Sequence, residues 1–367
     1  MSRKPTRRDF LTGRLRPLIP GQSGAAELST AWDASGAADH PALLVHVSRS
    51  AMACQFQVFL NGGQYPHGVS AALEALELLE VLEQQMSIFR PDSLIQQINR
   101  QAAFEPVVVE DRLFELLELA DAISRLTEGA FDLTCTPLWE VWGFAQRQPR
   151  VPTQAELAQA QEQVGWQYVC LNSADRTIRF TRPGIQLNLG SIGKGYAVDR
   201  CAEVLRQAGI EDFLIHGGQS SALARGNRQD VAGSLGWPVG LRHPLRPQRR
   251  LGQFWLHDLA LGTSGSGVQC FYSDGRRLAH IIDPRTGQPG GQDILSVTVL
   301  APTAAEADAL ATGLFLLGVE KTRQLCQQRP DLGVLLVLPD PPSGDVRVLA
   351  LGMAQSLWHP SCPPGDP

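Results

Sequence analysis

Apolar positions along the chain follow two repeating patterns, one typical of helices and one typical of strands. Between residues 69 and 86 leucines recur at helical spacing with glutamates between them, at Leu73, Leu76, Leu79 and Leu82. This pattern predicts an amphipathic helix with one wet, acidic face. The same spacing predicts helices at 111–127, from Thr153 onward, at 193–208 and at 303–318. Two of these helices begin with a capping-box pattern, Thr153 with Glu156 and Thr303 with Glu306.

Short apolar runs, alternating or continuous and bounded by turn residues, predict the strands. They lie within 42–60 and at 167–172, 176–181, 211–216, 221–225, 237–242, 252–262, 277–282, 333–338 and 345–351. Strands and helices are mixed without a regular β–α–β repeat, so we expect an α+β fold.

Local composition divides the chain into three parts. Residues 1–40 are rich in Arg, Pro, Gly, Ser and Ala, and we expect a flexible N-terminal segment there. Residues 41–355 hold the predicted elements and are expected to form the folded domain of the chain. Residues 356–367 are Pro-rich and are expected to be a loose tail.

Charge and cysteine usage exclude several classes of protein. The net charge is −5 and no long Lys/Arg run exists, so we expect no nucleic-acid partner. The seven cysteines are scattered without a C-x-x-C pair, which argues against a disulfide framework and a zinc site.

The N-terminal arginines raise the question of export. Arg7 and Arg8 resemble a twin-arginine signal, but residues 12–24 contain two further arginines and two prolines instead of an apolar core. We therefore expect a cytoplasmic protein, with export by a twin-arginine-like signal as the alternative. Elsewhere no apolar run reaches the ~20 residues that span a bilayer, so no stable membrane span is expected.

A Gly-rich turn over 188–199 is the first candidate for chemistry. There a strand ends, three glycines turn the chain and a helix begins. Backbone N–H groups at such a helix start can bind phosphate, and Lys194 adds a positive charge. The glycine spacing is not that of a Walker A loop. A purely structural turn remains the alternative.

Oxygen-bearing side chains supply the other candidates. Asp308 and Thr312 are four residues apart on one helix face and suit a hard cation such as Mg²⁺. The alternative is a threonine that bonds to its own helix beside a surface aspartate. Asp132 faces a ligand or forms an Asx turn. His280, followed by Asp283, is either functional or structural.

Five segments, taken together and in order, resemble the FAD:protein FMN transferase family, the ApbE-like flavin transferases. They are 86–99, 129–138 (GAFDLTCTPL), 188–199 (NLGSIGKGYAVD), 263–289 with TSG and HIIDPRTGQP, and 296–312 with SVTVLAP and ADALAT. The similarity extends from about Ala51 to Gly318. It implies a T-fold-related α+β fold with FAD in a central crevice. It also implies Mg²⁺-dependent transfer of FMN from FAD to a Thr or Ser hydroxyl of an acceptor protein, with release of AMP.

The resemblance also implies roles for individual residues. The implied FAD contacts are Met52, Phe89, Ala130, Phe131, Asp132, Asn188, Lys194 and His280. The implied metal ligands are the backbone carbonyl of Ser191 and the side chains of Asp308 and Thr312. We expect His280 to accept the proton of the acceptor hydroxyl, with Asp283 as the alternative acceptor or as the partner that orients His280.

The chain departs from the family pattern in two places. In the family an acidic or amide residue usually follows a Gly-Gly pair that is preceded by Asn; here Gln219 stands in the acidic place and Ile215 in the Asn place. The segment 266–270 lacks the usual Tyr and Arg. Two alternatives therefore stay open. One is a flavin-binding maturation module without transfer, and the other is an FAD pyrophosphatase that gives FMN and AMP.

Overall fold

The computed structural model of the chain describes residues 44–361, except 232, 268–269, 274 and 292. The flexible segment expected at 1–40 and the Arg7–Arg8 pair lie outside the described residues, so the cytoplasmic location stays a prediction. Among the described helices, none combines the length and apolar character needed to cross a membrane.

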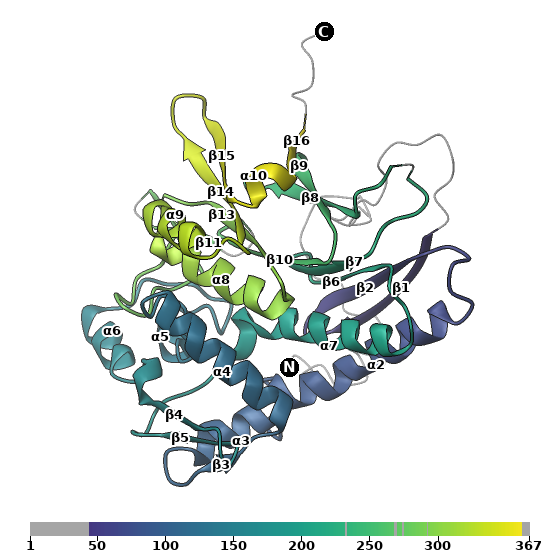
Figure 1. Cartoon of the computed structure of the whole chain (residues 1–367). Helices are drawn as coiled ribbons and strands as arrows, with labels where there is room; N and C mark the ends of the chain where they lie inside the picture. The colour runs from purple at the N-terminus through teal and green to yellow at the C-terminus, as the bar shows by residue number, and fades with distance from the viewer. Residues whose placement is uncertain (1–43, 232, 268–269, 274, 292, 362–367) are drawn as a thin grey trace, which may run out of the picture. The chain divides into compact units, whose positions relative to one another are not determined.

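An antiparallel sheet of eight strands forms the centre of the described part, in the order β1-β2-β6-β7-β10-β13-β14-β15 (Figure 1). The strands are β1 (Leu44–Ala51), β2 (Cys54–Asn61), β6 (Phe213–Gly217), β7 (Ser221–Arg225), β10 (Leu259–Gly265), β13 (Ser296–Ala301), β14 (Gly333–Asp340) and β15 (Asp345–Gly352). Successive side chains point to opposite faces of a strand. Val297 and Val299 thus join the core on one face, and Leu300 joins the core on the other.

Three helices cover one face of this sheet: α2 (Gly68–Met86), α7 (Gly193–Gln207) and α8 (Ala304–Leu317) (Figure 1). Glycine permits the closest approaches between them. A Cβ atom at Gly262 of β10 would lie 2.4 Å from the carbonyl carbon of Ala307, and one at Gly195 would lie 2.1 Å from the carbonyl oxygen of Ala304. These two contacts hold α8 directly against β10 and against the first turn of α7.

A small sheet covers the opposite face, with the strand order β16-β9-β8. Its strands are β8 (Trp237–His243), β9 (Arg246–Leu256) and β16 (Trp358–Pro360). Trp237 and Phe254 are fully buried and pack in one cluster with Leu300 of the central sheet. The central sheet therefore has an apolar core on each face.

Most of the remaining elements lie around the helix face and its margins, whereas α10 packs with the small sheet on the opposite face. They are α3 (Leu94–Gln101), α4 (Asp111–Leu126), α5 (Thr136–Val141), α6 (Gln154–Gln161), α9 (Val319–Gln328), α10 (Ala354–Leu357), β3 (Val107–Val108), β4 (Val169–Asn172), β5 (Thr177–Phe180), β11 (Cys270–Ser273), β12 (Arg276–Ala279) and the 3₁₀ turns Trp166–Tyr168 and Leu189–Ser191.

The α+β prediction is confirmed, and three details differ from the expectation. The strand expected at 252–262 is two strands, β9 and β10, because the chain turns at Asp258 with φ +51°. The expected tail 356–367 is folded as far as Pro360, because β16 pairs with β9. The capping box at Thr153 is complete. At Thr303 only half of it forms: the Thr303 hydroxyl accepts a hydrogen bond from the Glu306 N–H, while the Glu306 carboxylate pairs with Arg329.

We predict that Gly195→Ala lowers stability by about 1–3 kcal/mol, because its Cβ meets a backbone that cannot yield. Gly193→Ala is the matched control in the same helix turn, since a Cβ there finds only ordinary contacts at 3.7 Å. Urea unfolding monitored by circular dichroism gives both free energies. Equal stability of the two variants would contradict the close approach of α7 and α8.

Candidate active site

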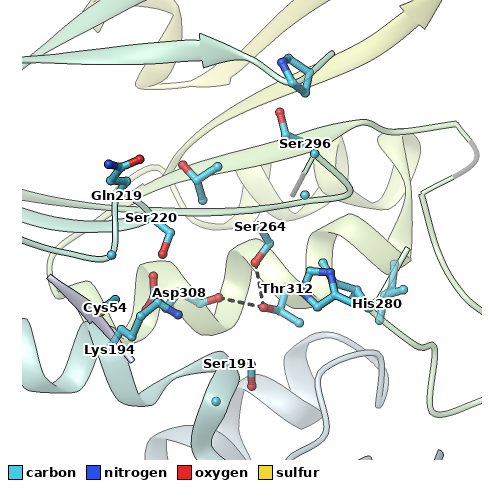
Figure 2. Close-up of a pocket in the computed structure, with 18 of the residues that line it drawn as sticks. Cys54, Ser191, Lys194, Gln219, Ser220, Ser264, His280, Ser296, Asp308 and Thr312 are labelled. Atoms are coloured by element: carbon cyan, nitrogen blue, oxygen red, sulfur yellow. Dashed lines mark hydrogen bonds between the residues drawn. The ribbon is translucent and has the colours of Figure 1, made fainter. Parts of the chain in front are cut away.

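A cavity of about 680 Å³ opens between the start of α7, the helix α8 and the end of β10. Its wall includes most of the polar residues that the sequence singled out, namely Asp132, Asn188, Ser191, Lys194, His280, Asp308 and Thr312. Figure 2 shows Asp308 and Thr312 on one helix, between Lys194 and His280. Segments more than a hundred residues apart in sequence thus meet at one site.

Asp308 is held firmly in the cavity wall. The residue is only 5% exposed, and its Oδ2 accepts a hydrogen bond of 2.8 Å from the backbone N–H of Gly195. The Ser221 hydroxyl lies 2.8 Å from Oδ1 and 2.6 Å from Oδ2. Burial raises the pKa of Asp308 to about 6, although Lys194 and these hydrogen bonds act in the opposite direction.

Thr312 follows Asp308 by one helical turn. Its hydroxyl donates to the carbonyl oxygen of Asp308 at 3.2 Å and lies 2.9 Å from the Ser264 hydroxyl (Figure 2). The back-bonding expected of a structural threonine is therefore present. The same oxygen faces the cavity, however, and a hydroxyl that donates its proton keeps lone pairs for a further partner.

Lys194 brings positive charge to the cavity from the second residue of α7. Among the described residues, no carboxylate lies within ion-pair distance of its ammonium group, which leaves this charge available to an anion. Two backbone amides near Lys194 do not fit the predicted role of binding phosphate. The Gly195 N–H is bonded to Asp308, and the Gly190 N–H is bonded to the Asn188 side chain at 2.9 Å. These two amides are therefore not phosphate donors.

The donor set around Asp308 fits a hard cation. In the described part of the chain, no three His, Cys, Asp or Glu side chains converge on one point, so a soft or all-protein metal cage is absent there. One carboxylate with a hydroxyl and a carbonyl is an oxygen-only set, to which substrate phosphates are typically added around Mg²⁺. Asp308, Thr312 and the Ser191 carbonyl can provide it.

His280 lines the cavity, whereas Asp283 does not. His280 follows β12, lines the cavity and packs edge-on against Phe144, with ring centroids 6.4 Å apart. The Asp283 carboxylate accepts hydrogen bonds of 2.8 and 2.9 Å from the Arg285 guanidinium and does not line the cavity. The geometry therefore favours His280 over Asp283 as a group that meets the substrate.

The residues implied as FAD contacts fall into two groups. Phe89, which is 76% exposed, and Ala130 line the cavity. Met52 packs against the core and its backbone N–H donates to Glu83, while Phe131 is 1% exposed within the core. The side chains of Met52 and Phe131 are therefore not part of the cavity wall.

Asp132 lines the cavity, but its carboxylate is already occupied. It accepts hydrogen bonds from the backbone N–H and hydroxyl of Thr134, both at 2.7 Å, and from the Trp166 N–H at 2.9 Å. Burial raises the pKa of Asp132, and these bonds oppose that rise. The Asx-turn alternative thus describes the observed contacts of this side chain.

Sequence reasoning missed two hydroxyl groups at the site. Ser221 holds Asp308 from 87 residues away, and Ser264 holds Thr312 from 48 residues away. Ser264 lies in the Thr-Ser-Gly segment that carried the resemblance, but no spacing rule connects either serine with its partner. The pairing of β7 with β10 and the packing of α8 against β10 bring each serine to its partner.

Known families, proteins and solved structures match this chain over most of its length. The model of the ApbE family matches residues 52–336. A protein of Klebsiella pneumoniae named FAD:protein FMN transferase is 32% identical over 275 residues, which cover 74% of this chain and 84% of that protein. Its namesake from Treponema pallidum is 35% identical, over 74% of this chain and 78% of that protein. The structure of flavin transferase ApbE from Vibrio cholerae superposes with a TM-score of 0.75 and 30% identity, over 86% of this chain and all of that one (100%).

We predict that Asp308 makes stability depend on pH when divalent metal is removed with EDTA. Its folded pKa of about 6 exceeds the ordinary value of 3.8, so the folded state favours the protonated form. Relative to Asp308→Asn, the wild-type protein should therefore lose on the order of 2–3 kcal/mol as the pH rises from about 4 to about 7.

Urea unfolding of both proteins at several pH values measures this difference, and the Asn variant cancels the titration of all other groups. A difference that stays constant across the range would show that Asp308 ionises as freely in the folded protein as in the unfolded chain.

Proposed function

We propose, on the premise that the chain belongs to the ApbE family and is an FAD:protein FMN transferase, that its acceptor group is a Thr or Ser hydroxyl. We further propose that the reaction requires Mg²⁺ and releases AMP. One observation carries this proposal. A buried carboxylate and a hydroxyl from a single turn of α8 face the same cavity as Lys194, whose charge no carboxylate of the described residues pairs.

The reaction exchanges one phosphorus–oxygen bond for another. The acceptor oxygen attacks the phosphorus of the FMN half of FAD, and the bond to the bridging oxygen breaks. AMP leaves with that oxygen and its electron pair. Asp308, Thr312 and the Ser191 carbonyl would hold a Mg²⁺ ion, which would neutralise part of the pyrophosphate charge.

The protein's own groups have separate tasks in this scheme. The Lys194 ammonium binds the phosphates from the α7 side and stabilises charge on the leaving phosphate. His280, on the far side of Thr312 in Figure 2, accepts the proton of the attacking hydroxyl. Ser221 and Gly195 keep the Asp308 carboxylate fixed in orientation, and Ser264 does the same for the Thr312 hydroxyl.

The decisive experiment incubates the full chain with FAD and Mg²⁺, with and without a candidate acceptor. AMP together with flavin fluorescence on the acceptor after denaturation shows transfer. AMP and free FMN in equal amounts, with or without acceptor, would indicate the pyrophosphatase instead. Absence of AMP under all conditions, with FAD still bound, would leave the flavin-binding module.

We predict that Asp308→Ala lowers Mg²⁺-dependent AMP release by roughly 10²-fold or more, because it removes the only charged oxygen of the donor set. Glu320→Ala on the exposed face of α9 also deletes one carboxylate and should change nothing. Rates are measured over a Mg²⁺ titration, and circular dichroism checks the fold. Wild-type turnover of the Asp308 variant at ordinary Mg²⁺ would refute the metal assignment.

For His280→Asn we predict retained FAD affinity and a loss of transfer of roughly 10²-fold, the usual size of a general-base effect. The Asn side chain can keep structural hydrogen bonds of the imidazole but cannot accept a proton as a base. The variant therefore tests the loss of the base alone. FAD binding and AMP release are measured on the same preparation. If AMP release with acceptor present stays near normal, His280 only supports the fold.

A further inference from the structure

The cavity continues around the end of a strand in the central sheet. β7 begins at Ser221, which pairs with Gly262 of β10, and the turn Gly218–Ser220 closes the β6–β7 hairpin just before it. β10 runs three residues further, to Gly265, and remains paired there with β13 only. Beyond the hairpin, one edge of β10 therefore has no neighbouring strand among the described residues.

Backbone directions at this edge follow from the register. The Thr263 N–H donates to the Ser220 carbonyl at 2.7 Å, so the peptide groups of Thr263 point toward the β7 side. In an antiparallel sheet these directions alternate along the strand. Ser264 thus bonds toward β13, and Gly265 points its N–H and C=O toward the β7 side again. No described residue bonds to the Gly265 N–H, and Gly265 lines the cavity.

The cavity reaches both faces of the sheet at this edge. On the helix face its wall includes Ser264, which bonds to Thr312. On the other face its wall includes Thr263, together with Leu241 and Phe254 of the small sheet. A continuous sheet would separate these two halves. They communicate because β7 is missing alongside Gly265.

We propose that the acceptor protein binds here as an extended segment that adds to the free edge of β10 at Gly265. This inference rests on the proposed function and names the form in which the acceptor hydroxyl is presented. An unpaired strand edge inside a cavity provides both a donor and an acceptor for main-chain pairing. The edge is short, so it holds a few residues around the modified one and not a long strand.

Strand geometry assigns the side chains of such a segment. Side chains alternate between the two faces, so a Thr or Ser on the helix face lies on the same side as Thr312 and the proposed metal ligands. Its two neighbours then point into the half lined by Leu241 and Phe254. Small or apolar neighbours suit that wall.

Charge adds a preference at the rim of this second half. Arg242 of β8 lines the cavity. Arg246 and Arg249 of β9 follow in the same hairpin and pair with the single carboxylate of Asp345 on β15, at 3.5 and 2.6 Å. The hairpin therefore brings positive charge to this part of the cavity. An acidic residue near the modified hydroxyl would find a complementary surface, whereas a basic one would be repelled.

A matched pair of variants tests the edge directly. Gly265→Pro removes the backbone N–H and so blocks main-chain pairing, whereas Gly265→Ala keeps the N–H. Both add the same Cβ, which would lie 2.8 Å from the Leu295 carbonyl oxygen, so any cost of that contact appears in both. We expect the Pro variant to transfer flavin to acceptor at least 10-fold less efficiently than the Ala variant. FAD affinity and urea unfolding of both variants, measured without acceptor, check that the nucleotide half of the site and the fold are intact.

The acceptor probe is a pool of blocked heptapeptides with one central Thr and varied flanks, read by the mass of attached FMN. Main-chain pairing needs the N–H of every second residue, so proline should be depleted at alternate positions among the modified peptides. Acidic flanks should be enriched over basic ones. Proline tolerated at every flanking position, or equal transfer by the Pro and Ala variants, would overturn the proposal.

Hydrogen exchange of the wild-type chain provides a second measurement that does not depend on the variants. Without peptide the Gly265 amide should exchange rapidly, and with a saturating modified peptide it should slow at least 10-fold. The Ser264 amide, bonded toward β13, serves as the internal control. Unchanged exchange at Gly265 would also overturn the proposal.

The outcomes separate this inference from the function on which it rests. If a folded acceptor protein receives FMN but no peptide of the pool does, recognition of an extended segment is wrong and the proposed transfer stands. If no AMP forms under any condition, the proposed transfer itself fails.

Discussion

The burial of one carboxylate organises this site. Asp308 lies on α8, yet its oxygens are bonded to the first turn of α7 and to the start of β7. An ionised carboxylate inside a protein is costly unless its hydrogen bonds are satisfied. The surrounding structure meets this requirement with a backbone amide and a hydroxyl, and in doing so it joins a helix, a second helix and the sheet at a single point.

Close packing makes that arrangement possible. Glycine at 195 and at 262 lets α8 approach α7 and β10 with backbone against backbone. Only at such separations can the short side chain of Asp308 reach Ser221 and Gly195. The remaining tendency of Asp308 to hold its proton, seen in its raised pKa, is the same property that favours a nearby cation. Lys194 and a hard metal ion both lower the cost of its negative charge.

The cavity shows how an interruption in a regular sheet can serve binding. The central sheet is continuous over eight strands, but β7 stops alongside Gly262 while β10 continues. This mismatch in length opens a passage between the two faces. It places a strand edge that no strand of the described residues pairs within the same cavity as Lys194, His280 and Thr312. The proposed chemistry needs two substrates, a dinucleotide and a polypeptide, and the two halves of the cavity offer each a separate wall.

The sequence by itself determined the fold class, most of the elements and the polar groups of the site. Helical spacing of leucines located α2, and the family motifs singled out Lys194, His280, Asp308 and Thr312, because periodicity and local motifs act over short distances along the chain. It did not decide which of two nearby candidates meets the cavity. His280 and Asp283 are three residues apart in sequence. In the structure the Asp283 carboxylate is engaged in an ion pair with Arg285.

Tertiary structure alone decided the contacts that join distant segments. No local pattern shows that Ser221 bonds to Asp308, that Ser264 bonds to Thr312, or that the side chains of Met52 and Phe131 are directed into the core. Nor does the sequence show that β7 ends before β10, since the length of a strand depends on whether its neighbour continues. These features follow from strand pairing and helix packing across many tens of residues, and they exist only once the chain has folded.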